Sequence, residues 1–217
     1  MRREVIGGCE LYLGDCMELM SQYPDKHFDL AIVDPPYGGG NHHQRNKQCR
    51  GSKGYSYGTA QKMQGWDIAP EPEYFAELFR VSKFQIIWGG NYFILPPQRN
   101  FIIYHKTNIP AGFDMAMCEF AWTNIPGNSR VFNCFLGIRN PDRWHPTQKP
   151  VALYKWLLFN YAKHGNKIID THMGSGSIAV ACNDMDFSLV ASEIDEDYFN
   201  AACKRIKIGA AQGKLDF

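Results

Sequence analysis

The sequence lacks an excess of charge of either sign, because 23 Lys and Arg residues stand against 22 Asp and Glu residues among 217. It also lacks an uninterrupted apolar run of the roughly 18 residues that a membrane-spanning helix needs. The first residues contain no apolar core and small-residue cleavage site of a signal peptide. We therefore expect a cytoplasmic protein without a membrane partner, and the length favours one domain over residues 1–217.

Cysteine pairs and metal-ligand clusters are also missing. The seven cysteines are odd in number and none belongs to a Cys-x-x-Cys pair, which argues against a disulfide framework or a thiolate zinc site. His42, His43 and Cys49 have no fourth ligand at a recognised spacing, so no metal is predicted. Most cysteines are expected to be reduced core residues.

Positive charge is concentrated in two segments despite the balanced total. Residues 38–66 hold no acid and several basic and aromatic residues, namely Arg45, Lys47, Arg50, Lys53, Lys62, Tyr55, Tyr57 and Trp66. Residues 125–150 hold four basic residues against Asp142, namely Arg130, Arg139, Arg143 and Lys149. Basic residues interleaved with stacking groups suit a nucleic acid, and the same composition also fits a solvated loop.

Apolar runs typical of strands alternate with helical patterns, which predicts an α/β fold with a largely parallel sheet. Strands are expected at residues 10–13, 28–33, 84–88, 100–104, 118–122, 167–169 and 187–191. The strands at 100–104 and 118–122 are predicted to pair as an antiparallel hairpin at the sheet edge. Helices are expected after Asp15, from Pro72, from Pro150, between the last two strands, and over residues 195–207.

The first motif with chemistry runs from Ile168 to Ser177. A strand leads into a Gly174-x-Gly176 turn that opens a helix, and the glycines let a ligand approach the backbone. Seventeen residues beyond Gly176, Glu193 ends the next strand, where an acid can bind both ribose hydroxyls of an adenosine-containing cofactor. The glycines also fit a dinucleotide pattern, which leaves a nicotinamide or flavin oxidoreductase open, and a merely tight turn is the structural alternative.

The second motif, Asp34-Pro35-Pro36-Tyr37, follows the buried strand 28–33 directly, so it should lie where parallel strands form a ligand crevice. Two prolines remove two N–H groups and stiffen the turn, which leaves carbonyl oxygens and one carboxylate. Hydrogen bonds from a nucleobase amine to Asp34 and the Pro35 carbonyl would aim the nitrogen lone pair at an electrophile, with Tyr37 packed on the base. These four residues are the catalytic candidates, and a proline-stiffened strand end is the alternative.

Together these motifs resemble the DNA amino-methyltransferases, which move a methyl group from S-adenosylmethionine to N6 of adenine or N4 of cytosine. Their order is similar to the permuted beta group, in which Asp-Pro-Pro-Tyr precedes the methionine-binding segment. Leu13-Gly14-Asp15-Cys16 resembles the element whose Asp contacts the cofactor adenine, and residues 145–150, His-Pro-Thr-Gln-Lys-Pro, resemble the element beside its amino-acid end. The matches span residues 10–205, and Thr171-His172 departs from the commoner Pro-Phe, as in several phage and prophage adenine methylases.

The resemblance implies a Rossmann-like methyltransferase fold, with helices on both faces of the sheet, and S-adenosylmethionine as cofactor. The cofactor-binding residues that it implies are Asp15, Cys16, His145, Thr147, Gln148, Lys149, Asp170, Thr171, His172, Gly174, Ser175, Gly176, Ser177 and Glu193. Transfer would be a direct displacement without a metal or covalent enzyme intermediate.

A paired base hides its amine, so the resemblance also implies a target base flipped out of DNA. Residues 38–66 and 125–144 become the expected DNA-facing insertions, with Arg45, Lys47, Arg50, Lys53, Tyr55, Arg130 and Arg139 as DNA-binding candidates. Asp at the first position of the second motif favours adenine N6, with cytosine N4 as the alternative. A non-catalytic nucleic-acid-binding module, an RNA substrate and a homodimer also stay open, and the expected setting is the cytoplasm of a bacterium or phage-infected cell.

Overall fold

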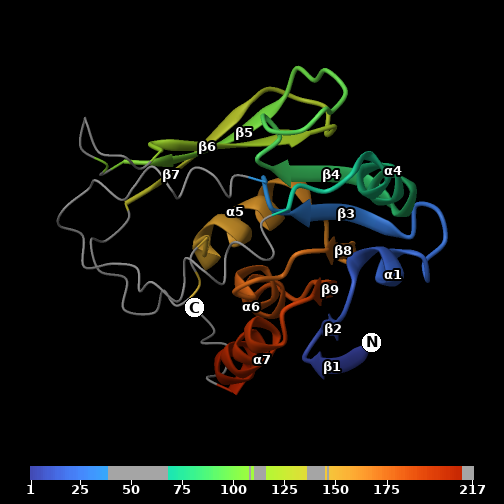
Figure 1. The fold of residues 1–217 in the computed structure, drawn as a ribbon. Helices are drawn as coiled ribbons and strands as arrows, with labels where there is room; N and C mark the ends of the chain where they lie inside the picture. Colours follow the sequence, from blue (N-terminus) through green and yellow to red (C-terminus); the bar gives the residue numbers. More distant parts are fainter. Residues whose placement is uncertain (39–67, 108, 110–115, 136–144, 146, 212–217) are drawn as a thin grey trace, which may run out of the picture.

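A computed structural model describes residues 1–38, 68–107, 109, 116–135, 145 and 147–211 (Figure 1). In this part of the chain, nine strands form one sheet in the order β1-β2-β9-β8-β3-β4-β6-β5-β7. The strands are β1 (Arg2–Ile6), β2 (Cys9–Leu13), β3 (Phe28–Val33), β4 (Ser82–Trp88), β5 (Phe101–Lys106), β6 (Cys118–Thr123), β7 (Arg130–Cys134), β8 (Lys167–Asp170) and β9 (Ser188–Glu193). The helices are α1 (Cys16–Met20), α4 (Pro72–Val81), α5 (Val151–Tyr161), α6 (Ser177–Asp184) and α7 (Glu196–Ala211).

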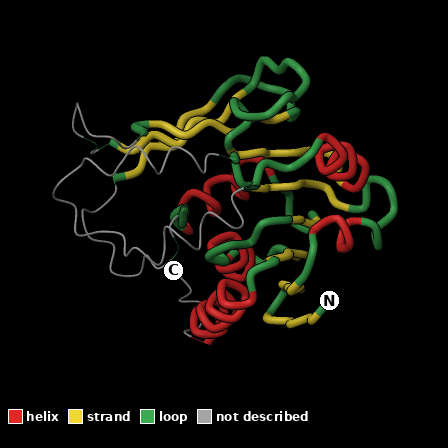
Figure 2. Tube along the Cα trace, viewed as in Figure 1, coloured by secondary structure: helices red, strands yellow, loops and turns green. Residues whose placement is uncertain are grey.

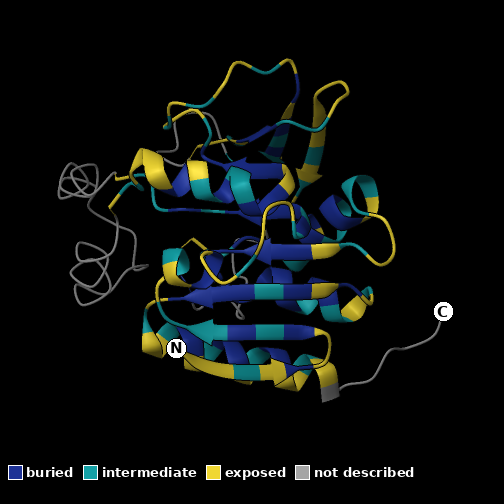
Figure 3. Cartoon of the chain, turned by 90° about the vertical axis from the view of Figure 1, so that its right-hand side faces the viewer, coloured by how far each residue is buried: buried dark blue, intermediate teal, exposed yellow. Residues whose placement is uncertain are grey.

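The sheet lies between two layers of helices, each with its own apolar core (Figures 1 and 2). On one face, α5, α6 and α7 bury Leu157, Ile178 and Phe199 against the strands. On the other face, α1 and α4 bury Met20 and Leu78. Figure 3 shows that the central strands are buried along most of their length, as parallel strands covered on both faces are.

The strand order places the ends of β3 and β8 together. These strands are parallel neighbours, with Leu30 opposite Ile168 and Ala31 opposite Ile169. After β8 the chain continues to β9 on one side, whereas after β3 it continues to β4 on the other side. Such a switch point, at the carboxyl ends of parallel strands, is where open α/β sheets bind ligands.

The predicted fold class is confirmed, and most predicted elements occur within two residues of their expected bounds. Strand β3 has the expected limits, and the antiparallel pairing of β5 with β6 is also confirmed. That hairpin is not at the edge, however, because β7 pairs with β5 outside it. Strand β7 lies inside the segment expected to be a loop, where the Asn, Gly and Pro residues that flank Arg130–Cys134 concealed a short strand.

At the N-terminal end, β1 was not expected from the sequence, and it pairs antiparallel with β2 at the other edge of the sheet. The predicted cap of α1 is confirmed, because Asp15 Oδ1 accepts hydrogen bonds from the N–H groups of Met17 and Glu18. Among the helices that the structure describes, none has the length and apolar character to span a membrane.

Candidate active site at the carboxyl edge of the sheet

Asp34 and the following residues to Tyr37, at the end of β3, are here called the acidic corner. Both carboxylate oxygens of Asp34 are held by hydrogen bonds. The Tyr37 hydroxyl donates a hydrogen bond of 2.6 Å to Asp34 Oδ1, and Lys149 Nζ donates to Oδ2. Burial, reinforced by the Asp34 charge, raises the pKa of Tyr37, so its hydroxyl stays protonated and remains a donor. The corner is therefore a half-buried carboxylate with a fixed orientation at the switch point.

An aromatic group surrounds the Tyr37 ring. Tyr92 stacks on it at 4.9 Å between ring centroids and 19° between planes, and Phe93 meets it at 6.0 Å. A Cβ at Gly89 would lie 2.1 Å from Tyr37 Cε1, and Gly89 has a φ of +68°, so only glycine fits there. The turn after β4 is thus shaped around Tyr37. Tyr92 is 64% exposed, so this aromatic group is open to solvent on the Tyr92 side.

Lys149 links the corner to two residues that sequence reasoning missed. Its ammonium contacts Glu119 Oε2 at 3.2 Å as well as Asp34, and Lys106 Nζ lies 2.5 Å from Glu119 Oε1. Glu119 belongs to β6 and Lys106 ends β5. Burial acts to raise the pKa of Glu119, but Lys149 and Lys106 together lower it to about 2. The signal that could have revealed this pair was a charged residue in each of two largely apolar strands, Glu119 in β6 and Lys106 at the end of β5.

The glycine turn after β8 is held mainly by backbone groups. The Met173 N–H donates to the Ser192 carbonyl at 2.9 Å, and Gly174 and Gly176 have φ values of +50° and +71°. Arg205 of α7 donates to the Ser175 carbonyl at 2.8 Å and to Ser177 Oγ at 2.9 Å. Both serine side chains are buried, and their hydroxyls lie 3.1 Å apart, so they fix the turn.

Glu193 ends β9, as predicted, and its carboxylate faces this turn. Its Oε2 accepts a hydrogen bond of 2.8 Å from the Gly174 N–H, and its Oε1 accepts one of 3.0 Å from the Asp195 N–H. Burial raises the pKa of Glu193, against the effect of those two N–H groups. A carboxylate has about four lone-pair positions, so after these two bonds and a further one from the Ile194 N–H, Glu193 retains a position for a ligand.

Three consecutive residues, from Asp170 at the end of β8 to His172, are linked by hydrogen bonds. Asp170 Oδ1 accepts from the His172 N–H at 3.0 Å, and burial raises the pKa of Asp170 to about 8. Thr171 Oγ1 lies 2.6 Å from the Tyr74 hydroxyl and 2.9 Å from His172 Nδ1. Burial lowers the pKa of His172 to about 4, so the ring is neutral at pH 7. The departure from Pro-Phe therefore has a partner in Tyr74 of α4, which the sequence did not indicate.

The segment from His145 to Lys149 bridges the two motifs. A Cβ on Gly174 would lie 3.4 Å from the His145 ring, which also packs edge-on against Tyr198 at 4.4 Å. Four residues later, Lys149 contacts Asp34. Gln148 lies between them, partly buried, and Thr147 is exposed. The glycine turn and the acidic corner are therefore on the same side of the molecule.

Of the remaining candidates, two lie at the carboxyl edge of the sheet and most of the others fall outside the described residues. Asp15 and Cys16 lie at the end of β2, beside β9, and Asp15 interacts electrostatically with His172. Arg45, Lys47, Arg50, Lys53, Tyr55 and Arg139 lie outside the described residues.

Arg130 is not brought to the site. Arg130 begins β7, and the strand pairings place it level with Trp88 at the end of β4, with β5 and β6 lying between the two strands. Its guanidinium donates to Asn160 and lies 6.0 Å from the Tyr161 ring, at the end of α5. The Arg130 side chain is therefore held against α5, and its contact with DNA stays a prediction.

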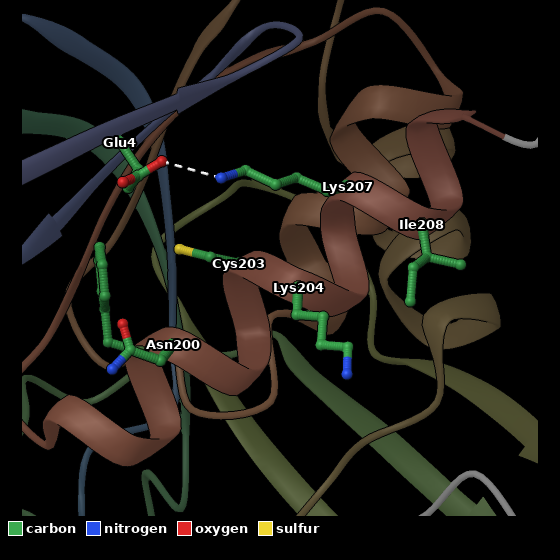
Figure 4. A pocket seen from close by; sticks show the side chains of 7 residues that line it. Glu4, Asn200, Cys203, Lys204, Lys207 and Ile208 are labelled. Atoms are coloured by element: carbon green, nitrogen blue, oxygen red, sulfur yellow. Dashed lines mark hydrogen bonds and ion pairs between the residues drawn. The ribbon is translucent and has the colours of Figure 1, made fainter.

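A surface hollow of about 300 Å³ lies elsewhere, between β1 and α7 (Figure 4). Its lining residues are Glu4, Phe199, Asn200, Cys203, Lys204, Lys207 and Ile208. Lys207 Nζ pairs with Glu4 at 3.1 Å across it, and both side chains are more than a third exposed. No motif residue lines this hollow, so the candidate site is defined by the residues that meet at the strand ends.

Comparison with known proteins agrees with this arrangement. The DNA methylase family model N6_N4_Mtase matches residues 80–204. YubD of Escherichia coli (strain K12), a methylase by name, is 23% identical over 202 residues, which cover 89% of this chain and 88% of YubD.

Two solved structures share the fold. The M1.HpyAVI–SAM complex has a TM-score of 0.58 and 20% identity, covering 91% of this chain and 99% of that chain. The cytosine-N4-specific PvuII DNA methyltransferase has a TM-score of 0.58 and 11% identity, and the match covers 97% of this chain and 96% of the PvuII enzyme. Because the family model matches more than half of the sequence, the chain belongs to the N6/N4 DNA methylase family, whose methyl donor is S-adenosylmethionine.

Proposed function

We propose that the protein is a beta-group DNA methyltransferase that methylates N6 of a flipped-out adenine. The observation that carries this proposal is the bridge between the two motifs, with His145 against Gly174 and Lys149 on Asp34. It brings a cofactor-type turn and an amine-orienting carboxylate to adjacent strand ends. An Asp at the first position of the second motif favours adenine within the family.

The ends of β2, β8 and β9 fit S-adenosylmethionine. The glycine turn packs against the His145 ring at Gly174, and Glu193 retains a lone pair for a ribose hydroxyl beside it. We assign the cofactor's amino-acid end to the segment around His145 and its adenine to the surroundings of Asp15 and His172. When bound, the cofactor supplies an activated methyl group on a positively charged sulfur.

Asp34 and its neighbours perform the transfer in this proposal. The target amine takes an Asp34 lone pair or replaces the Tyr37 hydroxyl on Oδ1, and the Pro35 carbonyl accepts its second hydrogen. The fixed carboxylate orients the amine and stabilises the positive charge that develops on nitrogen. The exposed Tyr92 ring, stacked on Tyr37, offers a face for the flipped base, which offsets part of the few kcal/mol that flipping needs.

The basic segments attach to this edge of the sheet. Residues 38–66 follow Tyr37 directly, and residues 136–144 lie between β7 and His145. We propose that their Arg45, Lys47, Arg50, Lys53, Tyr55 and Arg139 side chains contact DNA, mostly at phosphates, which position the duplex without specifying sequence.

Nucleoside mass spectrometry after incubation with S-adenosylmethionine and unmethylated DNA tests the proposal. The expected product is N6-methyladenine; N4-methylcytosine would overturn the adenine assignment, and DNA binding without product would indicate a non-catalytic module. Asp34→Ala should remove the product while S-adenosylhomocysteine binds within about threefold of wild type. Asp184→Ala, in an exposed ion pair with Lys155 on α5, is the control and should retain activity.

A further inference from the structure

Four charged side chains of alternating sign form a row behind the transfer point. From the site outward they are Asp34, Lys149, Glu119 and Lys106, joined by contacts from Lys149 to both acids and from Lys106 to Glu119. The Lys149 side chain is 4% exposed, Lys106 is 10%, Asp34 is 16% and Glu119 is 29%. The formal charges of the row sum to zero, and removal of any one leaves a net charge in a largely buried place.

Apolar surroundings extend the reach of these charges. The Lys149 ammonium lies 5.1 Å from the centroid of the Trp88 ring, and Lys106 lies 5.6 Å from that of Tyr104. Both aromatic residues are buried, and Tyr104 is opposite Glu119 in the pairing of β5 with β6. A charge that is largely buried in apolar surroundings is screened less than a charge in water, so it affects other charges several ångströms away.

Lys149 has two opposite effects on the site, and Glu119 compensates for one of them. An ammonium on Asp34 fixes the carboxylate, but it also cancels the negative charge that a cation at the transfer point would encounter. Glu119 shares the Lys149 ammonium and so restores negative charge, and Lys106 prevents that charge from becoming excessive. Under the proposed function, the group at this point is a sulfonium cation, whereas the product S-adenosylhomocysteine is neutral there.

We propose that Glu119 is a positioning residue that keeps Lys149 on Asp34 and balances its charge, so that the site accepts the cationic sulfonium. This inference rests on the proposed function. It makes Glu119 and Lys106, which lie in no recognised motif, determinants of the preference between the cationic donor and the neutral product.

Isothermal titration of the purified protein with S-adenosylmethionine and S-adenosylhomocysteine tests the inference without turnover. In Glu119→Gln the row carries one extra positive charge, so the donor should lose about tenfold more affinity than the product. In Lys106→Met the extra charge is negative, and the ratio should shift in the opposite direction. The double variant, again neutral, should return to within about threefold of the wild-type ratio.

The outcomes separate this inference from the function. If the wild type neither binds the donor nor methylates DNA, the proposed function is wrong. If the wild type does both but the ratio is equal in all four proteins, the charge-balancing role is wrong and the function stands. Loss of affinity for both ligands alike would show that Glu119 acts through packing alone. Lys106→Met keeps the test valid if Glu119→Gln does not fold, and Glu10→Gln, in an exposed pair with Arg3, is the matched control.

Discussion

The two halves of the candidate site are built from different groups. The half at the ends of β2, β8 and β9, here called the cofactor half, is held by turns and main-chain hydrogen bonds, such as those of Gly174 to Glu193 and Arg205 to the Ser175 carbonyl. The half at the ends of β3, β4, β5 and β6, here called the transfer half, is held by charged and aromatic side chains, with Lys149 between Asp34 and Glu119.

This difference predicts different responses to substitution. In the cofactor half, an added Cβ at a left-handed glycine changes the path of the main chain that shapes the site. In the transfer half, loss of one side chain leaves buried charges without partners, which is more destabilising than loss of an exposed pair. Each half should therefore be disrupted by a substitution that has a much smaller effect when it is made at a similar residue outside the site.

The largest effect is expected for Lys149→Met in the transfer half. Removal of the ammonium leaves Asp34 and Glu119 without their shared cation, so the free energy of unfolding should fall by about 3–5 kcal/mol. Urea denaturation measures this change. The control is Lys155→Met, whose ion pair with Asp184 is 43% and 37% exposed and should contribute only about 0–1 kcal/mol. Equal losses in the two variants would contradict the burial of Lys149.

In the cofactor half, Gly174→Ala should separate ligand binding from stability. Gly174 and Gly165 both have left-handed backbone, with φ of +50° and +84°, so alanine at either position should cost about 1–2 kcal/mol. Only at position 174 would the new Cβ approach another residue, the His145 ring, because nothing lies within 4 Å at Gly165. Calorimetry should show that Gly174→Ala binds S-adenosylhomocysteine about tenfold more weakly or worse, whereas Gly165→Ala binds normally. Equal affinities would remove the glycine turn from the binding site.

The sequence was sufficient to predict the cofactor half and the acidic corner, because both depend on local rules. A buried strand followed by Asp34, and a strand followed by Gly174 and Gly176, predict ligand groups at the carboxyl edge whatever the rest of the sheet does. The helix starts at Pro72 and after Pro150 are local in the same sense.

The sequence was not sufficient to predict the charge row, because it depends on pairings between distant strands. Glu119 reaches Lys149 only because β6 pairs with β4, and Lys106 reaches Glu119 only because β5 pairs with β6. No local pattern specifies that register. The contacts of Arg130 with α5 were not indicated for the same reason, since the position of β7 is set by its pairing with β5.

Two buried acids show the same contrast in their titration. Glu119, in the transfer half, contacts two lysines, and its pKa is lowered to about 2. Asp170, in the cofactor half, forms no ion pair within the described part of the chain. Burial raises its pKa to about 8, the Asp34 and Glu193 charges add to that rise, and the His172 N–H and Lys149 oppose it. Asp170 is thus protonated in the folded protein at pH values where it is ionised in the unfolded chain.

For Asp170→Asn the expected effect is a change in pH dependence. Between pH 3.8 and pH 8 the folded protein keeps the Asp170 proton that the unfolded chain releases, so rising pH destabilises the wild type through this group. Asparagine imitates the protonated acid and removes this dependence. The Tm of the variant relative to wild type, measured without ligand, should increase steadily from pH 4 to pH 8. The control Glu73→Gln, at an exposed position on α4, should give a constant difference. A constant difference for Asp170→Asn as well would show that Asp170 is ionised in the folded protein, and the contrast with Glu119 would fail.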